Sequence, residues 1–228
     1  MMGSGERHAN LRAFLIASAA LVVVLVLELL RGVDGIDIIN QVVLRNIGPD
    51  RQVIVEGISY TASLEVFAVL TAIAYFFDVG VHKSASKRLT SFAVAVIFSM
   101  IVTAILKAYI MEPRPHEPFI YFGLLGNLLN ADYYGFPSGH TVRVTVLAYY
   151  FTATPSMRRR GLSYVVILYA AVIMFTRLLL QVHWLWDIVG GIVVGVWSSL
   201  LVDGIGERLW VPLYNATLGR LSFLRLRQ

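Results

Sequence analysis

The sequence contains no cysteine, and this absence excludes several kinds of site. Without thiols the chain has no disulfide framework, no thiolate zinc site and no cysteine nucleophile. Any covalent catalysis must therefore use another side chain, and composition does not indicate the redox compartment.

Charged residues are also scarce. They make up 14% of the 228 residues, whereas soluble proteins have about a quarter. Hydrophobic residues make up 57%, and the mean hydropathy is +0.72. One small core cannot hide so much apolar surface, so lipid must be the solvent for much of it. In this context the formal net charge of +5 is a topology signal, and nucleic acid is not indicated as a partner.

Continuous apolar runs predict an all-α, polytopic membrane bundle with six transmembrane helices and a single domain over residues 1–228. The runs do not alternate as the strands of a barrel would. We interpret the first run as a retained span, because it is longer than the apolar region of a signal peptide. The predicted spans are 13–30, 60–77, 89–106, 136–154, 162–182 and 184–202, followed by a tail at 203–228.

The distribution of lysine and arginine predicts that both termini and the tail are cytoplasmic. With this orientation, 12 of the 19 cations lie on the inner side, as the positive-inside rule requires. In the first outer loop, apolar residues at Ile39, Val42, Val43 and Ile47 predict a short interfacial helix over 36–47. We interpret Gly48-Pro49 as its end.

Seven ionisable residues gather at the predicted outer ends of the spans. Such residues in membrane segments cost about 2.5–3.5 kcal/mol each on insertion scales, so they indicate function by default. Each alone has a structural interpretation, as a snorkelling anchor, a helix cap or part of an interfacial belt. Anchors have no reason to converge on one end together with two histidines. The seven are Lys107, Arg114, His140, Arg143, Arg177, His183 and Asp187.

Their chemistry suggests phosphoryl transfer. Lys107, Arg114 and Arg177 supply three positive charges, and the two guanidinium groups can grip phosphate oxygens bidentately. Ser138 and Gly139 precede an apolar helix, whose first amides and dipole favour an anion. Glycine also lets the backbone approach the ligand closely. These five residues are the predicted phosphate-binding set.

The remaining polar residues fit acid–base and nucleophilic roles. His183 and Asp187 are four residues apart, so on a helix they share a face. Asp187 can then fix the tautomer of His183 and stabilise its charge, which makes His183 a plausible nucleophile. His140 can protonate the leaving oxygen as a general acid.

A metal site is the alternative that these residue types leave open. Two histidines and one aspartate can bind zinc or iron. Three cationic side chains nearby would repel a metal ion and favour an anion, so we predict no metal and no cofactor.

The motifs resemble those of the type-2 phosphatidic acid phosphatase superfamily over about 80 residues, from Lys107 to Asp187. A lysine followed after six residues by Arg-Pro is matched by Lys107, Arg114 and Pro115. Pro-Ser-Gly-His is present unaltered at 137–140. The third motif, Ser-Arg-x5-His-x3-Asp, is matched from residue 176 with Thr176 in place of serine, which keeps the hydroxyl group.

The resemblance implies a phosphohistidine intermediate on His183, with His140 first as acid and then as base. It also implies that Lys107, Arg114, Arg177, Ser138 and the Gly139 amide hold the phosphate group, and that vanadate inhibits.

Two residues outside the motifs are possible accessory residues. Arg143 lies three residues after His140, near the same helix face. It either pairs with Glu65 in the second span or contacts a second phosphate of a diphosphate substrate. We favour the ion pair.

The predicted function is hydrolysis of a lipid phosphate or an isoprenoid diphosphate, by an integral protein of the cell membrane whose site faces away from the cytoplasm. A lipid phosphotransferase would share the first half-reaction, so the sequence does not separate the two. A soluble substrate resembling glucose 6-phosphate also stays open. Six spans argue against the soluble haloperoxidases, and apolar inner halves of the spans argue against an anion channel or transporter. The sequence indicates neither the lipid head group nor the oligomeric state.

Overall fold

The computed structural model describes residues 4–30 and 49–227. The interfacial helix expected at 36–47 lies outside the described residues. Apart from two strands of two residues each, the regular secondary structure of the described part is helical, and this confirms the all-α prediction. The helices are α1 (Ser4–Leu29), α3 (Pro49–Tyr60), α4 (Leu64–His82), α5 (Lys87–Ile110), α6 (Leu124–Leu129), α7 (Gly139–Thr152), α8 (Pro155–Arg159), α9 (Leu162–Leu179), α10 (Leu185–Leu201) and α11 (Glu207–Ala216).

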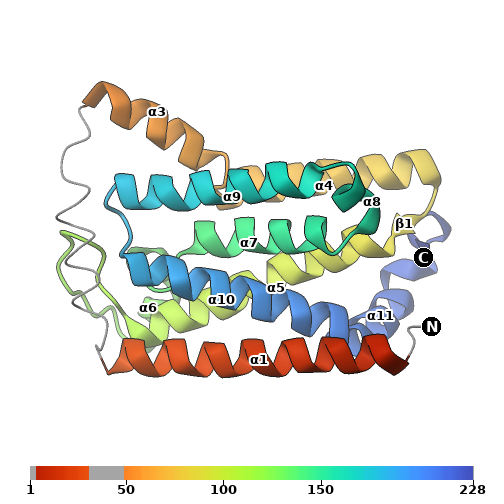
Figure 1. Cartoon of the computed structure of the whole chain (residues 1–228), viewed down its shortest axis with the longest axis horizontal. Helices are drawn as coiled ribbons and strands as arrows, with labels where there is room; N and C mark the ends of the chain where they lie inside the picture. The colour runs from red at the N-terminus through yellow and green to blue at the C-terminus, as the bar shows by residue number, and fades with distance from the viewer. Residues whose placement is uncertain (1–3, 31–48, 228) are drawn as a thin grey trace.

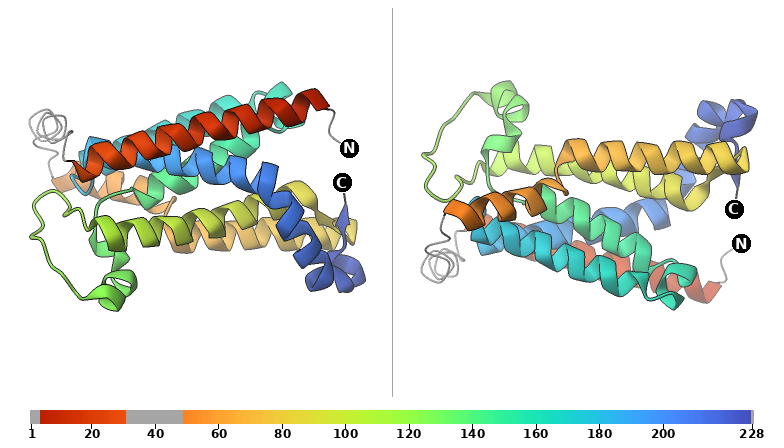
Figure 2. Two further views of the ribbon diagram at one scale, coloured as in Figure 1. Left: turned by 90° about the horizontal axis from the view of Figure 1, so that it is seen from below. Right: turned by 90° about the horizontal axis from the view of Figure 1, so that it is seen from above.

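Six of these helices run back and forth along the bundle and match the six predicted spans (Figure 1). Five of them are long and apolar enough to cross a membrane: α1, α4, α5, α9 and α10. The fourth predicted span, 136–154, forms the shorter α7 of 14 residues. It is packed among α5, α9 and α10, so its apolar residues serve mainly as core. Figure 2 shows α7 in the middle of the bundle.

The second span begins and ends later than the predicted 60–77, because local capping sets its ends. Ser63 is the N-cap of α4, and its hydroxyl accepts a hydrogen bond from the Val66 amide at 3.3 Å. Lys83, in the left-handed conformation, ends the helix. The preceding helix α3 was not predicted. Pro49 is its first residue, where a missing amide hydrogen costs nothing. Whether Gly48-Pro49 also ends a helix over 36–47 lies outside the described residues.

The residues after 203 form a folded cap at one end of the bundle, here called the tail end. Leu226 pairs with Ala85 in a small parallel sheet of β1 (Ala85–Ser86) and β2 (Leu226–Arg227). Arg227 forms an ion pair with Asp78 of α4. The tail therefore packs on the α4–α5 turn.

Helices α7 and α10 approach each other closely along a stripe of small residues. A Cβ atom at Gly191 would lie 2.7 Å from Thr141 Cβ and 2.9 Å from the Ser138 carbonyl oxygen. A Cβ atom at Gly195 would lie 2.7 Å from Thr145 Cβ. Glycines four residues apart permit such contact between membrane helices, and here they set the position of the α7 N-terminus.

We expect Gly191→Ala and Gly195→Ala each to destabilise the protein by about 1–3 kcal/mol, because the added methyl group has no room. Thermal unfolding in detergent measures the effect. Gly80→Ala on α4 is the matched control, since a Cβ atom there meets nothing within 4 Å. Equal stability of all three variants would contradict this account of the packing.

Candidate active site

The predicted site residues come together at the end of the bundle opposite the tail, here called the site end. Lys107 lies in the last turn of α5 and Arg177 in the last turn of α9. His140 lies in the first turn of α7, and Asp187 in the first turn of α10. All four helix ends meet on the same side of the bundle (Figure 1).

His183 and Asp187 form a buried hydrogen-bonded pair. The Nδ1 atom of His183 lies 2.9 Å from Oδ2 of Asp187, and each residue is 1% exposed. The same carboxylate oxygen accepts the Trp184 amide at 3.0 Å, which fixes the start of α10. With Nδ1–H donating to the carboxylate, a neutral His183 carries its lone pair on Nε2.

The environment keeps His183 neutral. His183 follows α9 and precedes α10, in the connection between them. Burial, together with the charges of Lys107, Arg177 and Arg114, lowers the pKa of this imidazole well below its ordinary value. A neutral imidazole is the form that can act as a nucleophile, and His183 is in this form at neutral pH.

The N-terminus of α7 forms the second part of the site. The Ser138 amide donates to the Asp187 carbonyl oxygen at 3.0 Å, which joins the starts of α7 and α10. The first helical bond runs from the Val142 amide to the Ser138 oxygen, so the amides of residues 139–141 precede the helical ladder. The Ser138 hydroxyl is buried and has no partner among the described residues. These donors suit an anion.

Three cations surround this helix start, each held by a neutral acceptor. Lys107 Nζ donates to the carbonyl oxygens of Tyr134 and Gly135, the latter at 3.0 Å. Arg114 donates to the Asp132 carbonyl oxygen. Arg177 Nη1 donates to the Ser59 hydroxyl at 2.6 Å. These contacts hold the cations in place without neutralising their charge.

Lys107, Arg114 and Arg177 lie close enough to both histidines for their charges to act on them. The Nε atoms of Arg114 and Arg177 are buried and have no acceptor among the described residues. Burial is also the main reason why the pKa of Arg114 is lowered from its ordinary value. His140 is half-buried at the start of α7. The arrangement can bind a tetrahedral oxyanion between a nucleophile and an acid.

The expected ion pair between Arg143 and Glu65 is not formed. Glu65 is exposed, in the first turn of α4. Arg143 is 5% exposed, and its Nε donates to the Ala62 carbonyl oxygen at 2.9 Å. The carboxylate stays at the surface because solvation there costs less than burial, and a backbone oxygen satisfies the arginine. A Cβ atom at Gly139 would lie 3.4 Å from Arg143 Nη1, so this cation borders the α7 N-terminus.

Sequence reasoning missed several residues that position the site. Ser59 and Ala62 come from the α3–α4 region, far from the motifs in sequence, and both accept hydrogen bonds from arginines. Gly135 approaches Asp187 so closely that a Cβ atom there would lie 2.9 Å from the carboxylate. In the parts of the chain that the structure describes, no group of three His, Cys, Asp or Glu side chains suits a metal ion.

Orthovanadate, which mimics pentacoordinate phosphorus, is expected to bind this site and to raise the unfolding temperature in detergent. At 100 times its dissociation constant, stabilisation reaches about 2.7 kcal/mol. Arg177→Gln should lose most of this increase when each variant is compared with itself without vanadate. Arg208→Gln, an exposed cation at the tail end, should keep it. An equal increase in both variants would place the anion elsewhere.

Comparison with known proteins identifies the fold and the family. The chain shares its fold with the crystal structure of a PAP2-type phosphatidylglycerolphosphate phosphatase from Bacillus subtilis, at a TM-score of 0.65 and 18% identity, over 85% of this chain and 96% of that one. It is also similar to LpxE from Aquifex aeolicus, at a TM-score of 0.54 and 19% identity, over 72% and 92% of the two chains. The sequence model of the PAP2 superfamily matches residues 88–206, just over half of the chain. The chain therefore belongs to the PAP2 superfamily.

Proposed function

We propose that this protein hydrolyses a lipid phosphate or an isoprenoid diphosphate through a phosphohistidine intermediate on His183, without a metal. The observation that carries the proposal is the buried His183–Asp187 pair, 2.9 Å apart, at the end of the bundle where Lys107 and Arg177 donate to carbonyl and hydroxyl oxygens. A neutral imidazole at an anion site is the arrangement that nucleophilic attack on phosphorus requires.

In the first step, Nε2 of His183 attacks the phosphorus atom and the bond from phosphorus to the leaving oxygen breaks. Asp187 stabilises the positive charge that develops on the imidazole. Lys107, Arg114, Arg177, the Ser138 hydroxyl and the first amides of α7 bind the equatorial oxygens, whose charge is dispersed in the transition state. His140 gives its proton to the leaving oxygen. The dephosphorylated lipid then departs.

In the second step, water attacks the phosphorus atom of phosphohistidine. His140, now neutral, takes a proton from this water, and the bond between phosphorus and Nε2 breaks. Inorganic phosphate leaves and His183 is again neutral. If an alcohol of a second lipid took the place of water, the same intermediate would give a phosphotransferase, and product analysis separates these two outcomes.

The membrane setting supports a substrate whose tail stays in lipid. Five helices are long enough to span a bilayer, and the site lies at one end of them. The Bacillus subtilis structure of the same fold is described as a phosphatidylglycerolphosphate phosphatase. Following the cation distribution, we propose that the site end faces away from the cytoplasm. Arg143 beside Gly139 adds a further cation, which suits a diphosphate head group.

Purified protein should release phosphate from phosphatidylglycerol phosphate, phosphatidate or a polyprenyl diphosphate in excess EDTA. His183→Ala should reduce the rate by about 10³-fold or more, because it removes the nucleophile. Radiolabelled substrate should leave an acid-labile, alkali-stable phosphoryl group on the wild type and none on the variant. Loss of activity with EDTA alone would sink the metal-independent mechanism, and an active His183→Ala enzyme would sink the assigned nucleophile.

Asp187→Asn tests the tautomer of His183. The amide oxygen can still accept the Trp184 amide, but it no longer stabilises a charged imidazole, so kcat should fall by about 10³–10⁴-fold. Steady-state assays of kcat and KM measure the change. Glu207→Gln, a carboxylate near the tail end, is the control and should leave kcat unchanged. A loss confined to KM would argue for a role in substrate binding instead.

A further inference from the structure

A cavity of about 600 Å³ lies between α4, α5, α7, α8 and α9, and the proposed reaction does not use it. We call it the α4–α9 groove. Most of its wall is apolar. The apolar and aromatic residues that line it include Leu70 and Ala74 on α4, Phe92 on α5, Phe151 near the C-terminal end of α7, and Tyr169 on α9. Figure 2 shows α4 and α9 diverging on either side of α7. The volume is in the range of about 300–1,000 Å³ that is typical of ligand sites.

The groove is separate from the active site. Tyr150 and Thr154 line it at the C-terminal end of α7, whereas His140 is at the N-terminal end. Tyr150 is ten residues after His140 in α7, which corresponds to about 15 Å along the helix axis. The lining extends from Thr61, before α4, and Leu147, past the middle of α7, to Asp78 and Thr154 toward the tail end.

One polar corner of the groove is formed by Arg88. Its Nη1 pairs with Asp203 at 2.6 Å and its Nε donates to the Thr154 hydroxyl at 3.2 Å. The remaining terminal nitrogen, Nη2, is buried and has no acceptor among the described residues. A buried guanidinium nitrogen without an acceptor is costly, so a ligand that supplies an anionic oxygen would stabilise it.

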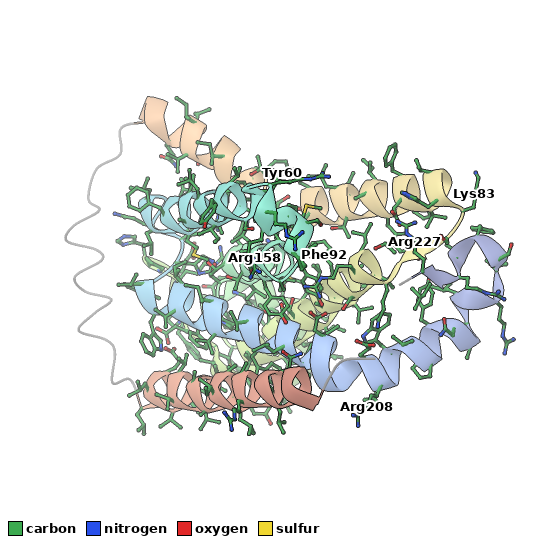
Figure 3. The ribbon with its side chains drawn as sticks, turned by 45° about the vertical axis from the view of Figure 1, so that its right-hand side comes forward. Tyr60, Lys83, Phe92, Arg158, Arg208 and Arg227 are labelled. Carbon is green, nitrogen blue, oxygen red and sulfur yellow. The ribbon has the colours of Figure 1, made fainter. Side chains whose placement is uncertain are left out.

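A run of cations borders the same corner. Met157 of α8 lines the groove, and Arg158, Arg159 and Arg160 follow it at exposed positions. Figure 3 labels Phe92, on the groove wall, Arg158, and Arg208 near the tail end. Two carboxylates lie at the same end, but Asp203 pairs with Arg88 and Asp78, which lines the groove, pairs with Arg227, so the exposed cations 158–160 leave an excess of positive charge. The groove thus joins an apolar slot to this excess, which suits a phospholipid with its chain and its phosphate.

We propose that the α4–α9 groove binds one acyl chain of an anionic phospholipid from the leaflet at the tail end, with its phosphate at Arg88 and Arg158. On the topology that the cations predict, this is the cytoplasmic leaflet, where anionic lipids attract such residues. The walls belong to helices that meet lipid directly, with Leu70 57% exposed. The lipid is a resident ligand, not the substrate, and this site does not depend on the proposed reaction.

Native mass spectrometry of delipidated protein tests the groove. The probes are phosphatidylglycerol and phosphatidylcholine with the same chains, in saturating orthovanadate so that the catalytic site is occupied. One phosphatidylglycerol should bind per chain. Ala74→Trp should weaken it about tenfold or more, because the ring excludes at least two methylene groups from the slot. Ile73→Trp is the matched control on the same helix, at an exposed position that does not line the groove.

The head-group contact is tested on the surface, where folding is not at risk. Arg158→Gln should weaken phosphatidylglycerol about fivefold and leave phosphatidylcholine unchanged. Arg208→Gln at the same end should change neither. Displacement of the lipid by vanadate, equal binding by Ala74→Trp and Ile73→Trp, or no effect of Arg158→Gln would each overturn the proposal.

Discussion

The site depends on the close approach of α7 and α10. Gly191 lets the Ser138 carbonyl and Thr141 come against α10, and the Ser138 amide then reaches the Asp187 carbonyl oxygen at 3.0 Å. This contact places the anion-binding start of one helix beside the histidine–carboxylate pair at the start of the other. A side chain at residue 191 would press against the Ser138 carbonyl oxygen and so move the proposed phosphate cradle away from the proposed nucleophile. The contact between α7 and α10 therefore sets both the packing of these two helices and the position of the proposed site.

The cationic side chains at the two ends of the bundle have different kinds of partner. At the tail end, Lys87, Arg88 and Arg227 pair with carboxylates. At the site end, in the part of the chain that the structure describes, Lys107, Arg114, Arg143 and Arg177 donate to carbonyl and hydroxyl oxygens or to sulfur. Neutral acceptors orient a cation but leave its charge in place. The site end thus keeps a positive potential in a poorly solvated region, where an arriving phosphate is held more strongly than in water.

Much of this structure could be predicted because hydropathy and the motifs are local signals. The predicted spans 89–106 and 184–202 lie within a few residues of α5 and α10, and the motif residues converge as expected. The errors arose where partners come from distant segments. Arg143 takes the Ala62 carbonyl oxygen and leaves Glu65 at the surface, and no sequence spacing shows a backbone acceptor 81 residues away. Helix α3, which begins at Pro49, was not predicted either, because its sequence is not apolar enough to indicate a span.

Because α7 is shorter than α5, the start of α7 lies deeper in the bundle than the end of α5. Gly139 lies level with Thr103 of α5, since a Cβ atom at Gly139 would be 4.0 Å from the Thr103 methyl group. Helix α5 continues seven residues beyond that point, to Ile110, which is about 10 Å further along its axis. The start of α7 therefore lies about two helical turns below the end of α5. A lipid phosphate normally rests at the hydrated surface of a bilayer, so a substrate of the proposed kind would descend along α5 and shed much of its water. The buried cations would then replace that lost hydration.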